Sequence, residues 1–389
     1  RRMESLTINN VGPIRHAQIE FADLTVLVGP QASGKSIALQ VWKLLLDAGQ
    51  IQGELSRYGL DWDKKLERFF NIYLGEGMGA LWDGNSSLAR NGRAVDLPRL
   101  AARKSRKKEE SLFFIPAQRV LTLHDGWPRP FTDYSPGDPF VVREFSERLR
   151  ILVEQMGSDG NIFPQPRRLS EAFRKILIQH VFADFRLSVD KTRQQKRLVL
   201  GRTESETLPY MVWSAGQREF VPLLLGLYWL MPRSAATKQK DVDWVVLEEL
   251  EMGLHPRAVA AAMMLVFSLL QRGYRVCLST HSTQVLDALW ALKHLRGNHA
   301  GPKALLDIFD VGNTTGMQNL AESALGKSVN VYYFDRDSGI AQNISNLDPT
   351  AEHPGEGGWG GLSEFSGRAN QAVAHAVADS MNHTEASSR

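Results

Sequence analysis

Short apolar runs alternate with amphipathic stretches along this chain, a pattern that predicts buried strands alternating with helices. The runs typical of buried strands span residues 24–28, 111–115, 243–247 and 275–279, with further strands expected at 185–190 and 197–200. Helical periodicity appears at residues 37–48, 141–155, 169–182, 220–231, 256–270 and 284–295, and residues 42–89 are largely helical in pattern. Such alternation favours an α/β fold with a mostly parallel central sheet.

The two ends of the chain show a different pattern. Residues 4–11 and 16–21 alternate apolar and polar positions, which predicts an antiparallel pair feeding the strand at 24–28. Residues 329–334 and 340–344 predict a hairpin, and the Asp and Gly requirement of its turn explains the acids at 335–339 better than a metal cluster does. A Gly-rich stretch, 354–361, and a polar tail follow.

These patterns predict one large domain with additions. We expect the main domain at residues 1–300, with helical and loop insertions at 40–110 and 120–185, then a C-terminal hairpin and helix extension at 301–375. Residues 376–389 are expected to form a disordered tail. With 389 residues, of which 43% are hydrophobic, the chain is long enough to bury a large core.

Composition narrows the class of protein. A single cysteine, Cys277, excludes an internal disulfide framework and a Cys-rich zinc site, and its expected place is the core of the strand at 275–279. The chain shows no secretion leader at its start, and its longest apolar stretches are shorter than a membrane span, so we expect a soluble, cytoplasmic protein without a membrane partner. The net charge is only +3, so any nucleic-acid contact must come from a local basic face.

A phosphate-binding loop lies between the strand at 24–28 and the helix that follows it. The pattern is a glycine, four residues, Gly-Lys and a hydroxyl residue, formed by Gly29, Pro30, Gln31, Ala32, Ser33, Gly34, Lys35 and Ser36. Its glycines let backbone N–H groups turn toward phosphates at the positive end of a helix. Lys35 can then reach the β- and γ-phosphates of ATP, and the Ser36 hydroxyl can ligate Mg²⁺.

Two carboxylates and a histidine follow later strands. Glu248 and Glu249 end the apolar strand at 243–247, where one acid can hold Mg²⁺ and the other can orient or deprotonate the attacking water. The alternative is a pair of exposed acids at a strand end. His281 follows the strand at 275–279 and suits a sensor that hydrogen-bonds the γ-phosphate, although it could also be one polar residue in a turn capped by Ser282.

The segment around Ser214 is a candidate for a second anion site. It reads Trp-Ser-Ala-Gly-Gln over residues 213–217 and precedes a helical run. The Ser214 hydroxyl, the Gly216 N–H and the helix N-terminus could hold the γ-phosphate of an ATP bound to another subunit, with Gln217 beside them. Alone, the same residues form an ordinary helix cap.

A basic run precedes the strand at 111–115. Its members are Arg99, Arg103, Lys104, Arg106, Lys107 and Lys108. Such a run is usually a solvated surface segment, and the alternative is a contact with nucleic-acid phosphates that weakens steeply as salt rises. The strand at 111–115 itself ends in a Pro-Ala-Gln-Arg sequence that places Gln118 just beyond it.

In this order, the motifs resemble those of the compact ABC-type ATPases of the AAA group, related to RecF, to chromosome-maintenance proteins and to the ATPase half of OLD nucleases. The resemblance implies a P-loop NTPase fold with an N-terminal antiparallel sheet and a helical insertion lobe, and ATP and Mg²⁺ as ligands. It makes Gln118 a contact to water and metal, Glu248 the second metal ligand, Glu249 the catalytic base, His281 the γ-phosphate sensor, and Ser214 and Gly216 donors to ATP of a second copy.

Two departures and one spacing refine the resemblance. Leu250 stands where many relatives have proline, and Ala215 replaces a glycine of the signature, so we expect turnover that is slow or stimulated by a partner. About 180 residues separate Ser36 from Ser214, without a sustained heptad pattern, which excludes a long coiled-coil arm.

The leading hypothesis is an ATP-driven switch that dimerises around two ATP molecules and regulates a separate effector, a nuclease or toxin. Small ATPases of this sort resemble those of antiphage systems such as Septu and PARIS. One alternative is a RecF-like, ATP-dependent DNA-binding or repair factor, which the basic run motivates. A second alternative is a scaffold that binds ATP without hydrolysing it.

Overall fold

The computed structural model describes residues 3–103, 109–156, 160–165, 168–191, 195–203, 205–232 and 238–387. Its centre is a six-stranded sheet in the order β16-β15-β3-β14-β13-β6. The strands are β3 (Leu24–Val28), β6 (Leu112–Ile115), β13 (Trp244–Glu248), β14 (Arg275–Thr280), β15 (Val329–Phe334) and β16 (Ala341–Asn343). All neighbours are parallel except β15 and β16. The carboxyl ends of five strands therefore meet at one edge of the sheet.

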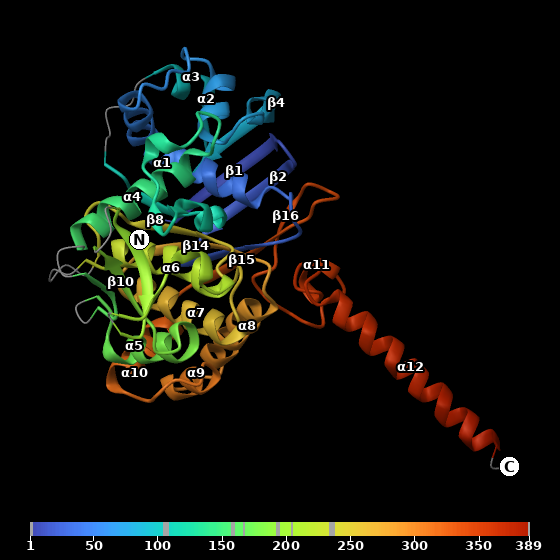
Figure 1. Ribbon diagram of the computed structural model, residues 1–389. Helices are drawn as coiled ribbons and strands as arrows, with labels where there is room; N and C mark the ends of the chain where they lie inside the picture. The colour runs from blue at the N-terminus through green and yellow to red at the C-terminus, as the bar shows by residue number, and fades with distance from the viewer. Residues whose placement is uncertain are drawn as a thin grey trace.

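One face of the central sheet packs against α1 (Lys35–Arg57) and an antiparallel sheet in the order β2-β1-β4-β5, at the top of Figure 1. This sheet consists of β1 (Glu4–Val11), β2 (Ile14–Phe21), β4 (Trp82–Arg90) and β5 (Arg93–Val95), flanked by α2 (Leu66–Tyr73), η1 (Met78–Leu81) and α3 (Leu97–Ala102). Leu27 of β3 faces this core, in which the rings of Phe21 and Trp42 stack with centroids 4.2 Å apart.

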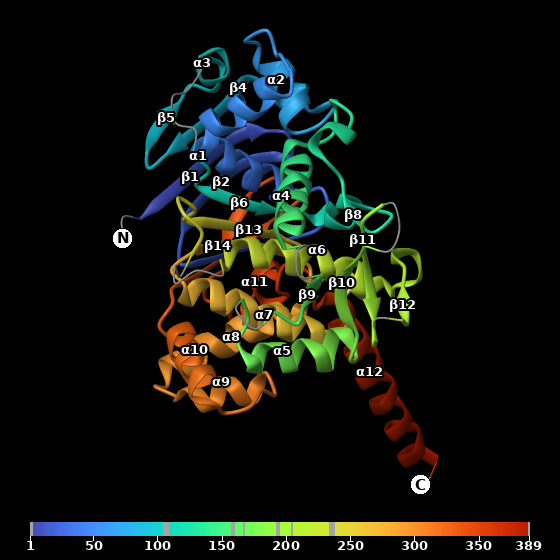
Figure 2. The ribbon, with the colours of Figure 1, turned by 60° about the vertical axis from the view of Figure 1, so that its left-hand side comes forward.

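The opposite face carries the larger core. Leu24, Val26 and Val28 alternate with Leu27 along β3 and pack on this side. The elements here are α5 (Glu171–Leu177), η4 (Ile178–Phe182), α6 (Ala215–Leu230), α7 (Pro256–Gln271), α8 (Thr283–Gly297), α9 (Pro302–Ile308) and α10 (Thr315–Leu325). Helices α5, α7, α8, α9 and α10 form the lower part of Figure 2. Helix α4 (Phe140–Met156) contributes residues to both cores.

A second antiparallel sheet, in the order β12-β11-β10-β9, joins the larger core. Its strands are β9 (Asn161–Phe163), β10 (Arg186–Asp190), β11 (Arg197–Gly201) and β12 (Thr207–Leu208), and η5 (Tyr210–Val212) follows them. Between β6 and α4 lie η2 (Ala117–Thr122), the small hairpin of β7 (Leu123–His124) and β8 (Trp127–Pro128), and η3 (Phe131–Asp133).

The predicted fold class is confirmed. The chain is an α/β P-loop fold with a mostly parallel central sheet, an N-terminal antiparallel pair formed by β1 and β2, and strands within two residues of the predicted bounds. Strand β13 lies between β14 and β6, as its continuous apolar sequence indicates. Cys277 is buried in β14, and burial raises the pKa of its thiol.

Two predictions for residues 37–89 need correction. Helix α1 has a kink at Asp47, whose backbone is not helical (φ −122°, ψ 20°), close to the predicted end at residue 48, but helix resumes beyond the kink and continues to Arg57. Residues 82–90, placed in a largely helical stretch, form strand β4, which pairs antiparallel with β1. Their sequence is polar and lacks strand alternation, so pairing with the open edge of β1 decides the structure.

The predicted hairpin at the C-terminal side is confirmed, but it is not a separate extension. β15 pairs antiparallel with β16 and also pairs parallel with β3, from Val329 opposite Leu24 to Tyr333 opposite Val28. The boundary expected at residue 300 therefore runs through one continuous core, since the strand next to the phosphate loop comes from the predicted extension.

The last described segment contains two helices, α11 (Pro354–Gly357) and α12 (Glu364–Ser387). Figure 1 shows α12 projecting away from the rest of the molecule. It enters the stretch 376–389 that the sequence indicates as disordered. The alanines at 372, 374, 376 and 378 are strong helix formers, which accounts for the helix.

Candidate nucleotide site

The central sheet brings the predicted motifs to one edge. The phosphate loop follows β3, His281 follows β14, Glu248 ends β13 with Glu249 directly after it, and Gln118 lies three residues after the end of β6. Because β3, β14, β13 and β6 are parallel neighbours, all these residues lie at the carboxyl edge. This is the edge at which ligands bind in open α/β sheets.

Lys35 lies inside the phosphate loop. Its Nζ donates to the carbonyl oxygens of Gly29 at 2.8 Å and Pro30 at 2.7 Å, so the ammonium is held where a phosphate would meet it. Burial lowers the pKa of Lys35 to about 8, although Glu249, Glu248 and Glu251 oppose that fall. These three acids lie at or just after the end of β13, which is two strands from β3 in the sheet.

The two glycines of the loop are fixed by close neighbours. Gly29 and Gly34 have φ values of 149° and 100°, which L side chains rarely adopt. A Cβ on Gly29 would lie 2.4 Å from the carbonyl oxygen of Phe334, and a Cβ on Gly34 would lie 2.4 Å from Cγ1 of Ile14. The loop therefore touches both the β1–β2 turn and the end of β15.

Glu248 and Ser36 fit the requirements of a Mg²⁺ site. Glu248 is buried, its Oε2 accepts from the N–H of Ala117 at 3.2 Å, and its Oε1 has no hydrogen-bond partner within the described part of the chain. Burial raises the pKa of Glu248, whereas hydrogen bonds from Ser36 and Ala117 oppose the rise. An orphaned buried carboxylate oxygen beside a hydroxyl is a fitting pair of ligands for Mg²⁺, which uses few protein ligands and keeps phosphate and water as the others.

No cluster of three or more His, Cys, Asp or Glu residues with metal-binding geometry occurs in the ranges that the structure describes. A dedicated all-protein metal cage is therefore not formed by those residues. Mg²⁺ held by one carboxylate, one hydroxyl and substrate phosphates needs no such cage.

Glu249 and His281 form a pair. His281 Nε2 lies 3.4 Å from Glu249 Oε1, and each side chain is 27% exposed. The hydrogen bond from His281 is the main cause that lowers the pKa of Glu249, with Lys35 adding to the effect. An ionised, partly exposed carboxylate beside the phosphate loop can accept a proton or a hydrogen bond from water.

The backbone of Glu249 is held in an uncommon conformation. Its φ is 47°, and its N–H donates to the carbonyl and hydroxyl oxygens of Ser279 at 3.0 and 3.2 Å. Such left-handed backbone is concentrated at functional sites. These two bonds to Ser279 of β14 fix the backbone position from which the side chain of Glu249 extends.

Two residues that the sequence analysis did not assign to the site form hydrogen bonds with the strand ends that carry it. Arg119 is fully buried and donates to the carbonyl oxygens of Glu248 and Glu249, both at 2.9 Å. Glu251 accepts from the hydroxyl of Thr280 at 3.0 Å and from the N–H of His281. Arg119 directly follows Gln118, and Glu251 lies in the same acidic run as Glu249, so adjacency to the motifs was the available signal.

Gln118 lies at the site edge but makes no contact that fixes its role. It is exposed on η2, and its side chain forms no hydrogen bond with a residue that the structure describes. Ala117, directly before it, donates to Glu248. The chain therefore places Gln118 next to the carboxylate, and its role stays a prediction.

Ser214 caps α6. Its hydroxyl accepts from the N–H of Gln217 at 3.2 Å, and the Gln217 side chain accepts from the N–H of Ser214 at 3.0 Å, which is a complete capping box. Gly216 lies against Gly253, whose carbonyl oxygen would be 3.4 Å from an added Cβ. Within the described residues, no hydrogen bond or ion pair joins 214–217 to the phosphate loop of the same chain.

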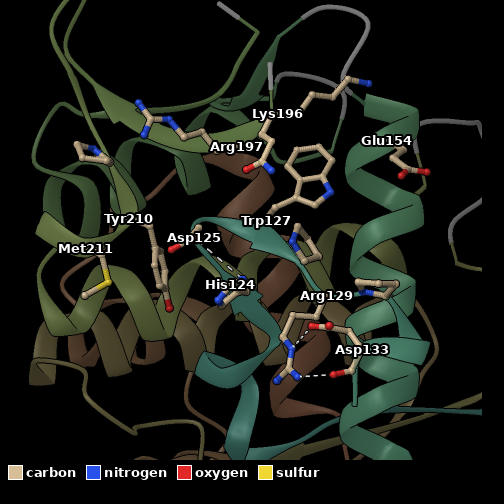
Figure 3. Close-up of a pocket in the computed structure, with 14 residues that line it drawn as sticks. His124, Asp125, Trp127, Arg129, Asp133, Glu154, Lys196, Arg197, Tyr210 and Met211 are labelled. Atoms are coloured by element: carbon tan, nitrogen blue, oxygen red, sulfur yellow. Dashed lines mark hydrogen bonds and ion pairs between the residues drawn. The ribbon is translucent and has the colours of Figure 1, made fainter. Parts of the chain in front are cut away.

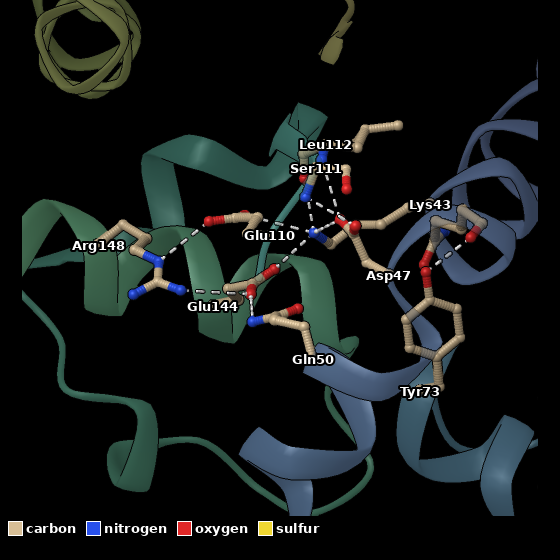
Figure 4. Close-up of polar contacts among 10 residues, drawn as sticks. Lys43, Asp47, Gln50, Tyr73, Glu110, Ser111, Leu112, Glu144 and Arg148 are labelled. Carbon is tan, nitrogen blue, oxygen red and sulfur yellow. Dashed lines mark hydrogen bonds and ion pairs between the residues drawn. The ribbon is translucent and has the colours of Figure 1, made fainter. Parts of the chain in front are cut away.

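The helix that follows the phosphate loop is anchored by a buried ion cluster (Figure 4). Lys43 Nζ lies 3.1 Å from Glu144, 3.3 Å from Asp47 and 3.4 Å from Glu110, and Arg148 approaches Glu110 and Glu144. Asp47 also accepts from the N–H groups of 111 and 112, at the start of β6. The cluster joins α1, β6 and α4 behind the loop.

The predicted basic run is only partly described. Arg99 lies on α3 and Arg103 at its C-terminal cap, and both are exposed. Residues 104–108, which include Lys104, Arg106, Lys107 and Lys108, lie outside the described residues. A role of the run in nucleic-acid binding stays a prediction.

A cavity in the described part of the chain lies away from these motifs (Figure 3). Its volume is about 1060 Å³, and it is bordered by the β7–β8 hairpin, α4, the start of β11 and η5, with Trp127, Arg129, Lys196 and Tyr210 among its lining residues. None of the predicted site residues lines it. The candidate site is therefore an edge of the sheet and not this cavity.

Most of the chain matches a known protein family. Residues 24–287 match the family described as "AAA domain, putative AbiEii toxin, Type IV TA system". Among solved structures, an SMC head domain from Thermotoga maritima is similar at 14% identity and a TM-score of 0.32, with 88% of this chain and 98% of that chain covered. An SmcHead bound to the C-winged helix domain of ScpA is similar at 11% identity and a TM-score of 0.39, with 88% and 97% covered. The comparison with curated proteins finds no match.

No helix in the described ranges combines the length and the apolar character that crossing a membrane requires.

Proposed function

The chain belongs to the AAA-domain family described as putative AbiEii toxin, Type IV TA system, and from this premise we propose that it is an ATP-binding and ATP-hydrolysing switch subunit that regulates a separate effector. The observation that carries the proposal is the pair of Glu249 and His281, 3.4 Å apart, beside the loop that contains Lys35. This pair supplies an ionised carboxylate and a hydrogen-bonding ring where the γ-phosphate of a bound ATP would lie.

Each residue of the site has a separate role in the proposed hydrolysis. Lys35 would leave the loop carbonyls and neutralise phosphate charge, and Glu249 would orient the attacking water and accept its proton. His281 would hydrogen-bond the γ-phosphate, and Glu251 positions it through its N–H. Glu248 and Ser36, with Gln118, would hold Mg²⁺, which supplies charge neutralisation of the phosphates when bound.

Dimerisation around two ATP molecules follows from the position of Ser214. The capped N-terminus of α6 is exposed and, among described residues, is not bonded to the phosphate loop of its own chain. The Ser214 hydroxyl accepts from Gln217 within the cap but can still donate its own hydrogen, and with the helix N-terminus it suits the γ-phosphate of ATP held by a second copy. Each ATP would then lie between Lys35 of one copy and Ser214 of the other.

We place this switch in defence against phage, paired with a nuclease or toxin. The toxin–antitoxin description of the matching family supports such a setting. The resemblance of the motif series to the ATPases of Septu and PARIS points the same way. Closed and open forms of the dimer would gate the effector, and turnover would be slow or stimulated by the partner.

The test is the mass in solution of Glu249→Gln with and without Mg-ATP. Trapped ATP should convert a smaller species into a dimer, and Lys35→Ala or Ser214→Arg added to Glu249→Gln should abolish the step. Glu322→Gln is the matched control, because it removes one exposed carboxylate on α10 and should leave hydrolysis unchanged. An assembly indifferent to nucleotide would contradict the switch, and unchanged hydrolysis in Glu249→Gln would contradict the role of Glu249.

A second candidate function is a RecF-like DNA-binding or repair factor. The exposed side chains of Arg99 and Arg103, which form no ion pair with a described residue, favour it. Binding to duplex DNA that strengthens with ATP and weakens with salt would support this function. Loss of that binding on replacing Arg99 and Arg103 by Glu would assign it to this segment, and no binding at low salt would exclude it. A non-hydrolysing scaffold would instead bind ATP without releasing phosphate.

A further inference from the structure

Glu219 lies on α6, between the segment at 214–217 and the end of β13. It belongs to the second turn of the helix that Ser214 caps, five residues and about 7.5 Å along the axis from the cap. Its side chain is 13% exposed, and its Oε2 lies 3.7 Å from Nε of Arg119. The helix that presents Ser214 to a second copy therefore also holds an acid against a buried guanidinium.

Arg119 joins Glu219 to the backbone of Glu249. Its Nη1 and Nη2 donate to the carbonyl oxygens of Glu248 and Glu249, both at 2.9 Å, and the side chain is fully buried. Burial lowers the pKa of Arg119, and Glu219 is the first of the four acids that oppose this fall. The N–H of Glu249 donates to Ser279, so Arg119 holds the second backbone polar group of Glu249.

The start of α6 also contacts the loop that follows Glu249. Gly253 has a φ of 68°, and a Cβ added there would lie 2.7 Å from Cγ of Glu219. A Cβ added at Gly216 would lie 3.4 Å from the carbonyl oxygen of Gly253. Because these contacts are close-packed, a displacement of the N-terminus of α6 is transmitted to the loop and to Glu219.

The contact between Glu219 and Arg119 is incomplete. Nε of Arg119 and Oε2 of Glu219 are both buried, and neither atom has a hydrogen-bond partner within the described part of the chain. Their separation of 3.7 Å is longer than an N–H···O hydrogen bond, which spans about 2.7–3.2 Å. A buried donor and a buried acceptor are unfavourable while unpaired, so a shift of less than about 1 Å that closes the pair is favoured.

We propose that Glu219 is a positioning residue that links a γ-phosphate at Ser214 to the carboxylate of Glu249 in the same chain. The inference rests on the proposed function, because Ser214 meets the ATP of a second copy only in the dimer. Binding of that phosphate shifts α6, and the Glu219 carboxylate closes on Nε of Arg119. The completed pair fixes the guanidinium and, with it, the carbonyl oxygen of Glu249. Each copy then hydrolyses its own ATP efficiently only when the other copy also holds ATP.

The test is a double-mutant cycle with Glu219→Gln and Arg119→Met, measured as kcat for ATP hydrolysis and as ATP affinity of the full chain. Glu219→Gln keeps the size of the side chain and removes its charge, so kcat should fall about tenfold while ATP affinity stays within about twofold. Since Glu219 acts through Arg119, adding Glu219→Gln to Arg119→Met should not slow hydrolysis further. In Ser214→Ala, which weakens the contact that moves α6, Glu219→Gln should have less than its tenfold effect.

Glu147→Gln is the matched control. Glu147 on α4 is 14% exposed, and its partners are Arg150 at 2.6 Å and the N–H of Phe131 rather than Arg119. The variant loses an ion pair of similar burial and should keep kcat. If Glu219→Gln does not fold, Glu219→Asp is the second variant, because it keeps the charge but withdraws the carboxylate by one methylene and should lower kcat in the same way.

The outcomes separate this inference from the proposed function. Unchanged kcat in Glu219→Gln, or a loss that adds fully to that of Arg119→Met or Ser214→Ala, would overturn the role of Glu219 and leave the ATP switch intact. An equal loss in Glu147→Gln would also overturn it, because any ion pair of this burial would then have the same effect. Absence of ATP hydrolysis, or of an ATP-dependent dimer, in the unaltered protein would overturn the proposed function and this inference together.

Discussion

Replacing Lys43 by methionine tests whether the buried ion cluster holds the helix of the phosphate loop in place. Lys43 is fully buried, lies within 3.4 Å of carboxylate oxygens of Asp47, Glu110 and Glu144, and donates to the carbonyl oxygen of Leu112 at 2.7 Å. Burial alone would lower the pKa of Lys43, but the three carboxylates outweigh it and raise that pKa above its usual value. The cation is therefore present in the folded protein at neutral pH.

The expected loss of unfolding free energy follows from the burial of Lys43. Removing one member of a buried ion cluster leaves the others uncompensated and costs about 3–5 kcal/mol of unfolding free energy. The matched control is Lys303→Met, because Lys303 and Asp307 also form an i,i+4 pair but are 67% and 61% exposed. An exposed pair of this kind is worth about 0–1 kcal/mol. The same substitution at the two sites isolates the effect of burial.

The pH dependence gives a second readout. Burial raises the pKa of Glu110 from its usual value of 4.5 to about 7, and Glu144 adds to the rise, whereas Lys43 opposes it. A carboxyl whose pKa is higher in the folded protein binds its proton more tightly there, so its contribution to stability falls as the pH rises from 4.5 through 7. Without Lys43 the pKa rises further. Lys43→Met should therefore lose more stability at pH 8 than at pH 5.

The assay is urea unfolding of the unaltered protein, Lys43→Met and Lys303→Met at pH 5 and pH 8. A loss below about 1 kcal/mol for Lys43→Met, or an equal loss at the two pH values, would refute the reasoning. In that case water or a shift of α4 would have compensated the carboxylates. Nucleotide binding by the folded fraction would then show whether α1 still presents the loop.

Three further predictions concern the nucleotide site. Gly29→Ala should lower ATP affinity at least about tenfold and destabilise the fold by about 1–3 kcal/mol, because the new Cβ meets the carbonyl oxygen of Phe334; calorimetry and thermal unfolding measure both. The affinity of the unaltered protein for ATP should fall as the pH rises above 8, because the pKa of Lys35 is lowered to about 8 and only the cation binds phosphate; titration at pH 7 to 9.5 that found no fall would contradict this. Arg119→Met should slow hydrolysis about tenfold or more while ATP binding persists, since Arg119 holds the carbonyl of Glu249; unchanged phosphate release would refute that role.

Much of the fold was predictable because its signals are local. The apolar run at 24–28 and the glycines after it dictate a strand and a phosphate loop, and β3 has those bounds. The acids after β13 and the histidine after β14 lie together because the carboxyl ends of parallel strands share an edge. The two apolar runs that predict these strands are enough to imply this arrangement. The pairing of Glu249 with His281 follows from this shared edge.

The remainder depends on contacts between distant residues. The polar sequence of β4 becomes a strand because β1 offers an open edge, and the helix resumes beyond the kink at Asp47, where Gly49 is buried. Arg119 acts through backbone carbonyl groups of Glu248 and Glu249, which leave no mark in the sequence. No local pattern could show that β15 would lie beside β3.

The position of β15 has a consequence for protein synthesis. Asp23 and Ser328, which are hydrogen-bonded where β3 and β15 begin, are separated by 305 residues. A ribosome adds about 5–20 residues per second, so β3 is synthesised on the order of 15–60 seconds before β15. During that time the phosphate loop lacks the backbone of Phe334 against Gly29. Nascent chains that stop before β15 should therefore carry the full loop sequence and still fail to form the nucleotide site, which ties the ability to bind ATP to nearly complete translation.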